Sequence, residues 1–203
     1  MKRVLLLAVL AGLLAAPARA ANPVVVVETS LGTIKIELDR DKAPITVKNF
    51  LSYVDEKFYD DTVFHRVLGK ENTRDREDFF VQAGRFTGDH KEKMTRAPIK
   101  SEAGNGLTNT RGSVAMARAD DADSATSQFF INLKDNKVFD KSDQGPGYTV
   151  FGKVIQGMEV VDKIKAVRTG EKKFIVRDGD ERTFMNVPEE DVVIKSVRLE
   201  KAK

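Results

Sequence analysis

Hydrophobic and polar residues alternate along two short stretches near the start of the chain. Val24 to Val27 is β-branched throughout, and Thr33-Ile34-Lys35-Ile36-Glu37-Leu38 places an apolar residue at every second position. A period of two is typical of a strand with one buried face, and Ser30-Leu31-Gly32 between the stretches has the composition of a turn. The pattern therefore predicts a β-hairpin.

Apolar residues then recur at helical spacing. Pro44 stands where a first helical turn is expected, and four apolar residues follow it three or four positions apart: Val47, Phe50, Leu51 and Val54. This predicts an amphipathic helix from about Pro44 to Glu56. A second helix is predicted after Gly157, where the same spacing returns in Met158, Val161 and Ile164.

Five further apolar runs are short and are separated by loops rich in Gly, Asp, Asn and charge: residues 62–68, 79–82, 113–117, 128–133 and 148–155. Val192 to Leu199 alternates again and predicts a last strand. Many short strands with polar turns are typical of β-sandwiches and barrels. With about eight strands and two helices, the sequence predicts a mainly β fold, a closed barrel with helical plugs.

Two segments follow neither period. Residues 69–78 are strongly charged, and residues 170–190 mix charged pairs with short apolar pieces. The second segment contains Asp178-Gly179, a dipeptide that favours tight turns, so a hairpin is one interpretation of it.

The first twenty residues have the composition of an export signal. Met1-Lys2-Arg3 is followed by the apolar run Val4 to Ala16 and by Ala18-Arg19-Ala20, the pattern of a signal peptide. The apolar run is shorter than the ~20 residues that a membrane anchor needs. We expect cleavage after Ala20, which leaves residues 21–203 as a single domain in the periplasm, with secretion as the alternative.

Cleavage changes the charge of the chain. The full sequence has 34 Lys and Arg against 31 Asp and Glu, but the first twenty residues hold Lys2, Arg3 and Arg19 and no acid, so 31 of each remain. A formal net charge of zero argues against nucleic-acid binding, and no stable membrane insertion is expected after cleavage. A monomer is the default expectation.

The sequence offers little for a metal or a cofactor. It has no cysteine, its two histidines are His65 and His90, and Asp120-Asp121-Ala122-Asp123 lacks the Gly and the distal Glu of a calcium loop. It also has no Gly-x-Ser-x-Gly motif and no phosphate-cradling glycine loop. We therefore expect no metal, no cofactor, no disulfide and no serine hydrolase chemistry.

Five short motifs follow one another along the chain: Phe64-His65-Arg66-Val67, Phe79-Phe80-Val81-Gln82-Ala83-Gly84, Gly112-Ser113-Val114-Ala115-Met116-Ala117, Ser127-Gln128-Phe129-Phe130-Ile131 and Val150-Phe151-Gly152-Lys153-Val154. In order and spacing they resemble the cyclophilin family, over nearly all of residues 21–203. The resemblance implies an eight-stranded antiparallel β-barrel capped by two α-helices, with the active groove on its outer face. It also implies peptidyl-prolyl cis-trans isomerase activity on proline-containing peptides and unfolded proteins.

Within this resemblance, Arg66 matches the catalytic arginine, and Gln82 matches a glutamine expected to donate a hydrogen bond to a substrate carbonyl. Rotation about an X-Pro bond has a barrier of ~18–20 kcal/mol because the amide is resonance-stabilised. In the twisted state the prolyl nitrogen regains a lone pair, which a fixed cation can stabilise without proton transfer. The permanent charge and planar donors of arginine suit this task.

The resemblance also implies the remaining groove residues. The proline pocket is expected from Phe79, Phe80, Phe130 and Phe139, whereas Phe129 is expected to point into the core because neighbouring strand residues face opposite ways. The rest of the groove is expected from Met116, Ala117, Arg118, Gln128 and Tyr148.

Three positions depart from the common family pattern. Arg118 replaces a frequent Asn, Val138 stands where many members have an aromatic residue, and Tyr148 stands where many have His. The missing indole donor at Val138 argues against tight ciclosporin binding, and Arg118 is a candidate for altered preference around the proline.

Two other functions remain as alternatives. A noncatalytic cyclophilin-like module or chaperone for proline-containing segments would use the same groove, but it would not need Arg66, Gln82 and Phe130 together. A barrel of structural type would bind through the loops at 69–78 and 170–190 instead. The joint presence of the three groove residues favours the enzyme.

Overall fold

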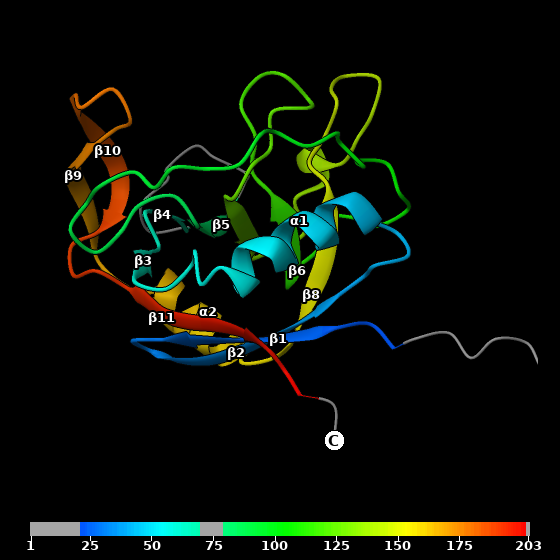
Figure 1. Cartoon of the computed structure of the whole chain (residues 1–203), viewed down its shortest axis with the longest axis horizontal. Helices are drawn as coiled ribbons and strands as arrows, with labels where there is room; N and C mark the ends of the chain where they lie inside the picture. The colour runs from blue at the N-terminus through cyan, green and yellow to red at the C-terminus, as the bar shows by residue number, and fades with distance from the viewer. Residues whose placement is uncertain (1–20, 70–78, 202–203) are drawn as a thin grey trace, which may run out of the picture.

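One curled antiparallel sheet dominates the structure, a computed structural model that describes residues 21–69 and 79–201 (Figure 1). The expected signal peptide and nearly all of the charged segment 69–78 lie outside the described residues. The nine strands of the sheet follow the order β3-β11-β1-β2-β8-β6-β7-β5-β4. Their bounds are β1 (Val24–Thr29), β2 (Gly32–Leu38), β3 (Thr62–Val63), β4 (Arg66–Leu68), β5 (Phe80–Ala83), β6 (Ser113–Met116), β7 (Phe129–Asn132), β8 (Val150–Gln156) and β11 (Val193–Leu199).

The sheet has one strand more than expected because the run 62–68 is divided. β3 pairs with β11 and β4 pairs with β5, so the chain bends at Phe64 and His65. The bend keeps its backbone hydrogen bonds, because Phe64 N–H donates to Val192 O at 2.9 Å and His65 N–H donates to Gln82 O at 3.1 Å. The bent segment thus contributes to both ends of the sheet. The fold class predicted from the sequence is confirmed.

The first hairpin forms as the alternation predicts. β1 and β2 pair with Val27 opposite Ile34, and both side chains are buried. Gly32 has a φ of 136°, and a side-chain carbon at this position would lie 2.8 Å from Val160 Cγ2. The turn therefore needs glycine, both for its conformation and for its close approach to Val160.

Two α-helices pack on the sheet. α1 (Pro44–Asp55) begins at its proline, lies near β11, and buries Phe50 against the rings of Tyr59 and Phe129, with centroids 5.0 and 5.5 Å apart. α2 (Met158–Lys165) packs against β2, β4 and β5 through a buried apolar face. Both helices match the predicted positions. Within the described residues, neither helix is long and apolar enough to cross a membrane.

The segment 170–190 forms a separate hairpin. β9 (Thr169–Ile175) pairs antiparallel with β10 (Glu181–Pro188), and Gly179 lies at the turn with a φ of 86°. Figure 1 shows this hairpin at one end of the molecule, beside β3 and β4. A small apolar cluster of its own holds it there: Val63, Phe86, Phe174, Val176 and Val187. The hairpin interpretation is confirmed.

Strand alternation divides the side chains of β5, β6 and β7 between two faces. Phe129 and Ile131 of β7 belong to the main core, whereas Phe130 points to the other face and joins a smaller apolar cluster. That cluster comprises Leu68, Phe80, Ala115, Phe130 and Val150, with Leu107, Ala117, Phe139 and Tyr148 packed against it. The candidate site lies on this outer face.

Candidate active site

Arg66 and Gln82 lie directly opposite each other on neighbouring strands. Arg66 of β4 is the register partner of Gln82 on β5, and Gln82 is in turn the partner of Phe130 on β7. Residues opposite each other in antiparallel strands project to the same face of a sheet. The pairing therefore brings a cation, an amide and an aromatic ring side by side, although 64 positions separate Arg66 from Phe130 in the sequence.

Three phenylalanines form an apolar wall next to these strands. Phe80 and Phe130 have ring centroids 5.2 Å apart, and Phe139, from the short 3-10 helix η1 (Lys137–Phe139), lies 5.8 Å from Phe80 and 5.5 Å from Phe130. The guanidinium carbon of Arg66 lies 5.1 Å from the centroid of Phe80. This cation–π contact helps to orient the Arg66 charge at the edge of the apolar wall.

A hollow of about 160 Å³ opens between these groups. Its lining consists entirely of predicted site residues: Arg66, Phe80, Gln82, Ala117, Arg118, Phe130, Phe139 and Tyr148. Such a hollow can hold a small apolar ring against the phenylalanines while a guanidinium and an amide face the adjoining backbone. This combination fits the chemistry of proline isomerisation.

Arg118 and Tyr148 close one side of the hollow. The guanidinium carbon of Arg118 lies 4.6 Å from the Tyr148 ring centroid, and its Nε donates to Gly147 O at 2.9 Å. Its Nη1 donates to Ala119 O at 2.7 Å and to Asp120 O at 3.1 Å. Arg118 thus braces two loops against each other, and the sequence did not predict this bracing contact.

Gln128 contacts the site through Gln82. Gln82 Nε2 donates to Gln128 Oε1 at 2.9 Å, which links the strands β5 and β7 through their side chains. Gln128 does not line the 160 Å³ hollow but a neighbouring cavity, which Arg66 and Gln82 also line. The predicted site therefore continues beyond the proline-sized hollow.

Two predicted groove residues, Met116 and Phe79, do not line the hollow. Met116 is 1% exposed and packs in the main core, because on β6 it faces the same way as Val114. Phe79 precedes β5, packs against the main core and lies 5.0 Å from Lys134 Nζ, so its ring is not part of the hollow. A single sequence cannot resolve which residue of a strand end turns outward.

His65 lies beside the site and was not predicted to be part of it. It lies at the bend before Arg66, is 4% exposed, and lines the same neighbouring cavity as Gln128. Burial, together with the cations of Arg85 and Arg66, lowers the pKa of His65 to about 3, so the imidazole is neutral at neutral pH. Its position next to Arg66 in the first motif was the available signal.

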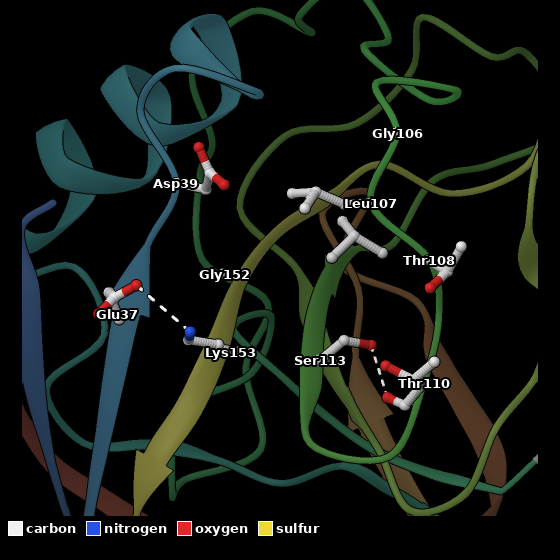
Figure 2. A pocket seen from close by; sticks show the side chains of 10 residues that line it. Glu37, Asp39, Gly106, Leu107, Thr108, Thr110, Ser113, Gly152 and Lys153 are labelled. Carbon is white, nitrogen blue, oxygen red and sulfur yellow. Dashed lines mark hydrogen bonds and ion pairs between the residues drawn. The ribbon is translucent and has the colours of Figure 1, made fainter.

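A separate hollow of about 250 Å³ lies away from these residues (Figure 2). Glu37 and Lys153, register partners on β2 and β8, form a 3.6 Å ion pair on one side of it, and Ser113 Oγ donates to Thr110 O at 2.7 Å. None of the predicted site residues lines it. Over residues 21–69 and 79–201, no group of three or more His, Cys, Asp or Glu side chains could hold a metal ion.

The structure is a curled antiparallel sheet with a groove on its outer face. This groove can hold an apolar ring beside the Arg66 guanidinium, which is the arrangement expected of a protein that binds proline-containing peptides. Comparison with known proteins specifies the family. A family profile described as cyclophilin type peptidyl-prolyl cis-trans isomerase/CLD matches residues 24–199. The chain belongs to the cyclophilin-type peptidyl-prolyl cis-trans isomerase family and is an isomerase.

Curated relatives cover nearly the whole chain. A peptidyl-prolyl cis-trans isomerase of Acinetobacter baylyi is 49% identical over 191 residues, which is 94% of this chain and 93% of the relative. Peptidyl-prolyl cis-trans isomerase B of Escherichia coli is 49% identical over 174 residues, 84% of this chain and 96% of the relative. The fold is also that of a Cryptosporidium parvum cyclophilin type isomerase solved in the presence of the dipeptide Ala-Pro, with a TM-score of 0.67 and 22% identity, covering 88% of this chain and 99% of that one.

Proposed function

We propose that this isomerase accelerates rotation about X-Pro bonds in unfolded or flexible proteins, and that Arg66 and Gln82 are its catalytic residues. The observation that carries the proposal is the register pairing of Arg66 with Gln82 beside the phenylalanine-lined hollow. In the hollow, a predicted cation, a predicted amide and a predicted aromatic wall share one lining.

The hollow would hold the proline ring by apolar contact with Phe80, Phe130 and Phe139. Rotation then twists the preceding amide, and its nitrogen lone pair becomes available as a hydrogen-bond acceptor. A guanidinium N–H from Arg66 would donate to that nitrogen in the twisted state more strongly than in either planar state. Gln82 would donate an amide N–H to a substrate carbonyl and hold the backbone in place.

The proposed site makes few contacts with substrate side chains other than the proline ring, so it should accept many sequences. The hollow is small and selects the ring, whereas the expected polar contacts go to backbone atoms. Proline-containing peptides and unfolded chains are therefore the proposed substrates. A folded protein would be bound only at an X-Pro segment that is exposed and flexible enough to enter the groove.

We further propose that residues 1–20 are a signal peptide and that the mature monomer, residues 21–203, acts in the periplasm or, as the alternative, after secretion. The support is the charged start, the apolar centre and the small-residue motif before Ala21. Mass spectrometry of the protein from a periplasmic extract would test this. A mature N-terminus at Ala21 supports the proposal, and an intact Met1 in the cytoplasmic fraction contradicts it.

Exchange NMR on a short Ala-Pro peptide distinguishes two hypotheses for this protein. One is an active isomerase, and the other is a noncatalytic module that binds peptides in the same groove. The isomerase is expected to raise the cis-trans exchange rate well above its uncatalysed value, for which one event takes tens to hundreds of seconds. Peptide binding that shifts resonances of the Phe130 region without faster exchange would show a noncatalytic cyclophilin-like module instead.

A further inference from the structure

A second cavity adjoins the proline-sized hollow and shares its two catalytic residues. It has a volume of about 480 Å³, and Arg66 and Gln82 lie between it and the hollow because they line both. Its opposite wall is formed by β10, from Thr183 to Asn186. We propose that this cavity is a second substrate subsite, which takes the carboxylate side chain of an Asp or Glu flanking the proline. The inference deepens the proposed function and rests on it.

The charges around the cavity favour an acidic ligand. Arg66 and Arg85 line it, and none of its described lining residues is acidic. Arg85 is paired with Glu92, with Nε at 3.1 Å and Nη2 at 3.4 Å from the carboxylate oxygens. The same carboxylate also lies 3.7 Å from Arg177 Nε, so one acid is shared between two guanidinium groups. Among the described residues, the lining of the cavity thus carries two guanidinium groups and no carboxylate.

Hydrogen-bonding groups on the cavity wall match a carboxylate as well. Gln82 and Gln128 contribute side-chain amides, and Thr183 contributes a hydroxyl from β10. Such groups can donate to the oxygens of a carboxylate. His65 also lines the cavity.

The hairpin wall is held in position by packing and by backbone bonds. Phe184 of β10 lies against Phe86 and Phe174, with ring centroids 5.1 and 5.4 Å apart. Ile175 O accepts from Glu92 N–H at 2.9 Å, and Ile175 N–H donates to the backbone of the same loop at the same distance. A wall fixed in this way loses little conformational freedom when a substrate binds.

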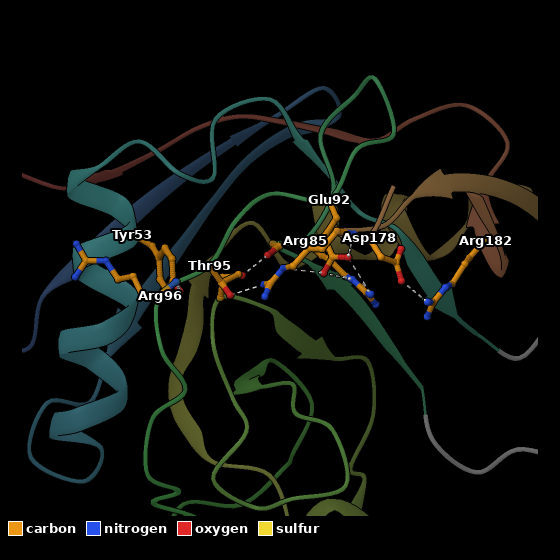
Figure 3. Close-up of polar contacts among 10 residues, drawn as sticks. Tyr53, Arg85, Glu92, Thr95, Arg96, Asp178 and Arg182 are labelled. Carbon is orange, nitrogen blue, oxygen red and sulfur yellow. Dashed lines mark hydrogen bonds and ion pairs between the residues drawn. The ribbon is translucent and has the colours of Figure 1, made fainter. Parts of the chain in front are cut away.

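Arg85 belongs to the same fixed wall. Its guanidinium carbon lies 4.7 Å from the Phe86 ring and 5.3 Å from the Phe184 ring. Figure 3 shows Arg85 and Glu92 side by side near Asp178, with Arg182 beyond them on the hairpin. Arg182 pairs with Asp178 at 2.7 Å and does not line the cavity. It therefore offers a matched control for Arg85.

An extended substrate can occupy both sites at once. Each residue of an extended chain adds about 3.3–3.6 Å, and the two cavities meet at the same pair of side chains. A residue one or two positions from the proline would therefore place its side chain between Gln128 and β10. Met185, 57% exposed, stands at the rim, where it can cover the methylene groups of that side chain.

The test uses one Ala-rich peptide with a central Ala-Pro and variants that carry Glu, Gln or Lys singly at each of the two positions on either side. Exchange NMR gives kcat/KM for each peptide, and titration of the same samples gives Kd. At one position, Glu is expected to exceed Lys about two- to fivefold in kcat/KM and in affinity, the size of a favourable half-exposed ion pair. Gln is expected to fall between them.

Three protein variants locate the effect. Arg85→Met is expected to bring the Glu-to-Lys ratio close to one, and Thr183→Glu, on an exposed strand position, is expected to invert it. Arg182→Gln removes an arginine of β10 that does not line the cavity, and it is expected to keep the ratio. Flat Glu-to-Lys ratios at every position, or a ratio that survives both Arg85→Met and Thr183→Glu, would overturn the inference.

The two proposals fail in different ways in this experiment. If the Ala peptide is not accelerated at all, the proposed catalysis is wrong, while the Kd ratios still decide whether the acidic subsite exists. If the Ala peptide is accelerated and the ratios are flat, only the subsite is wrong.

Discussion

The side-chain amides of Gln82 and Gln128 are hydrogen-bonded to each other, with Gln82 Nε2 donating to Gln128 Oε1 at 2.9 Å. Gln82 lies on β5 and Gln128 immediately precedes β7, so the bond joins the two strands at the groove. An amide NH₂ has two donors, and this bond uses one of them. Gln128 can thus orient Gln82 while the second donor serves a substrate carbonyl.

Removing either glutamine should therefore reveal this coupling. Gln82→Met is expected to lower kcat/KM about tenfold, the loss of a hydrogen bond of about 1.4 kcal/mol in the transition state. Gln128→Met is expected to cost about threefold, because Gln82 keeps its donor but loses its orientation. Exchange NMR on the double variant is the deciding measurement. We expect activity close to that of Gln82→Met alone, and a multiplicative loss would mean that the two residues act independently.

Phe129 and Phe130 are adjacent in the sequence and face opposite sides of the sheet, which makes them a matched pair. Phe129→Leu is expected to lower the free energy of unfolding by about 1–3 kcal/mol through its core contacts, without changing KM. Phe130→Leu should raise KM severalfold, because the ring faces Phe80 and Phe139 in the hollow. Urea denaturation and exchange NMR measure both quantities. Equal effects of the two changes on KM would contradict the assigned faces.

Stability should depend on pH through His65. Its pKa is about 3 in the folded protein, against 6.5 for a histidine in an unfolded chain, because burial disfavours the charged ring. Between these values the unfolded state binds one proton more than the folded state, so stability falls as the pH falls. The expected slope is about 1.4 kcal/mol per pH unit between pH 6 and about 4.5.

A matched variant isolates this contribution. Asp60 and Asp191 also have lowered pKa values, but stability from carboxylates is lost only below about pH 4, near their unfolded values. Urea denaturation of His65→Gln across pH 4.5–6 should therefore give a nearly flat dependence. An unchanged slope in His65→Gln would show that other groups carry the acid sensitivity.

Much of the fold could be predicted from the sequence because its signals are local. The alternation at residues 24–38, the spacing after Pro44 and the Asp178-Gly179 turn each predicted the element that formed. The division of 62–68 into β3 and β4 was not predictable in the same way. The bend at Phe64 and His65 depends on pairing with two other strands, β11 and β5. These pairings produce no periodic pattern of apolar residues in the sequence.

The site was predicted less completely, for a related reason. The family resemblance identified the residues of the hollow, but the side on which Met116 and Phe79 project depends on strand register. The cavity beside β10 was not predicted, because it joins Gln128 to Thr183, which are 55 positions apart. Tertiary contacts of this kind become visible only in the folded chain.

Arg66 carries the central claim, and exchange NMR of an Ala-Pro peptide with wild type, Arg66→Ala and Arg66→Lys tests it most directly. We expect Arg66→Ala to lower kcat/KM about 100-fold, as the loss of one preorganised donor to a transition state does. Arg66→Lys should stay at least about tenfold below wild type, since an ammonium lacks the planar donor set. Arg182→Gln controls for loss of a surface arginine, and matching spectra of the variants verify the fold. A folded Arg66→Ala that keeps half or more of the wild-type rate would contradict the account.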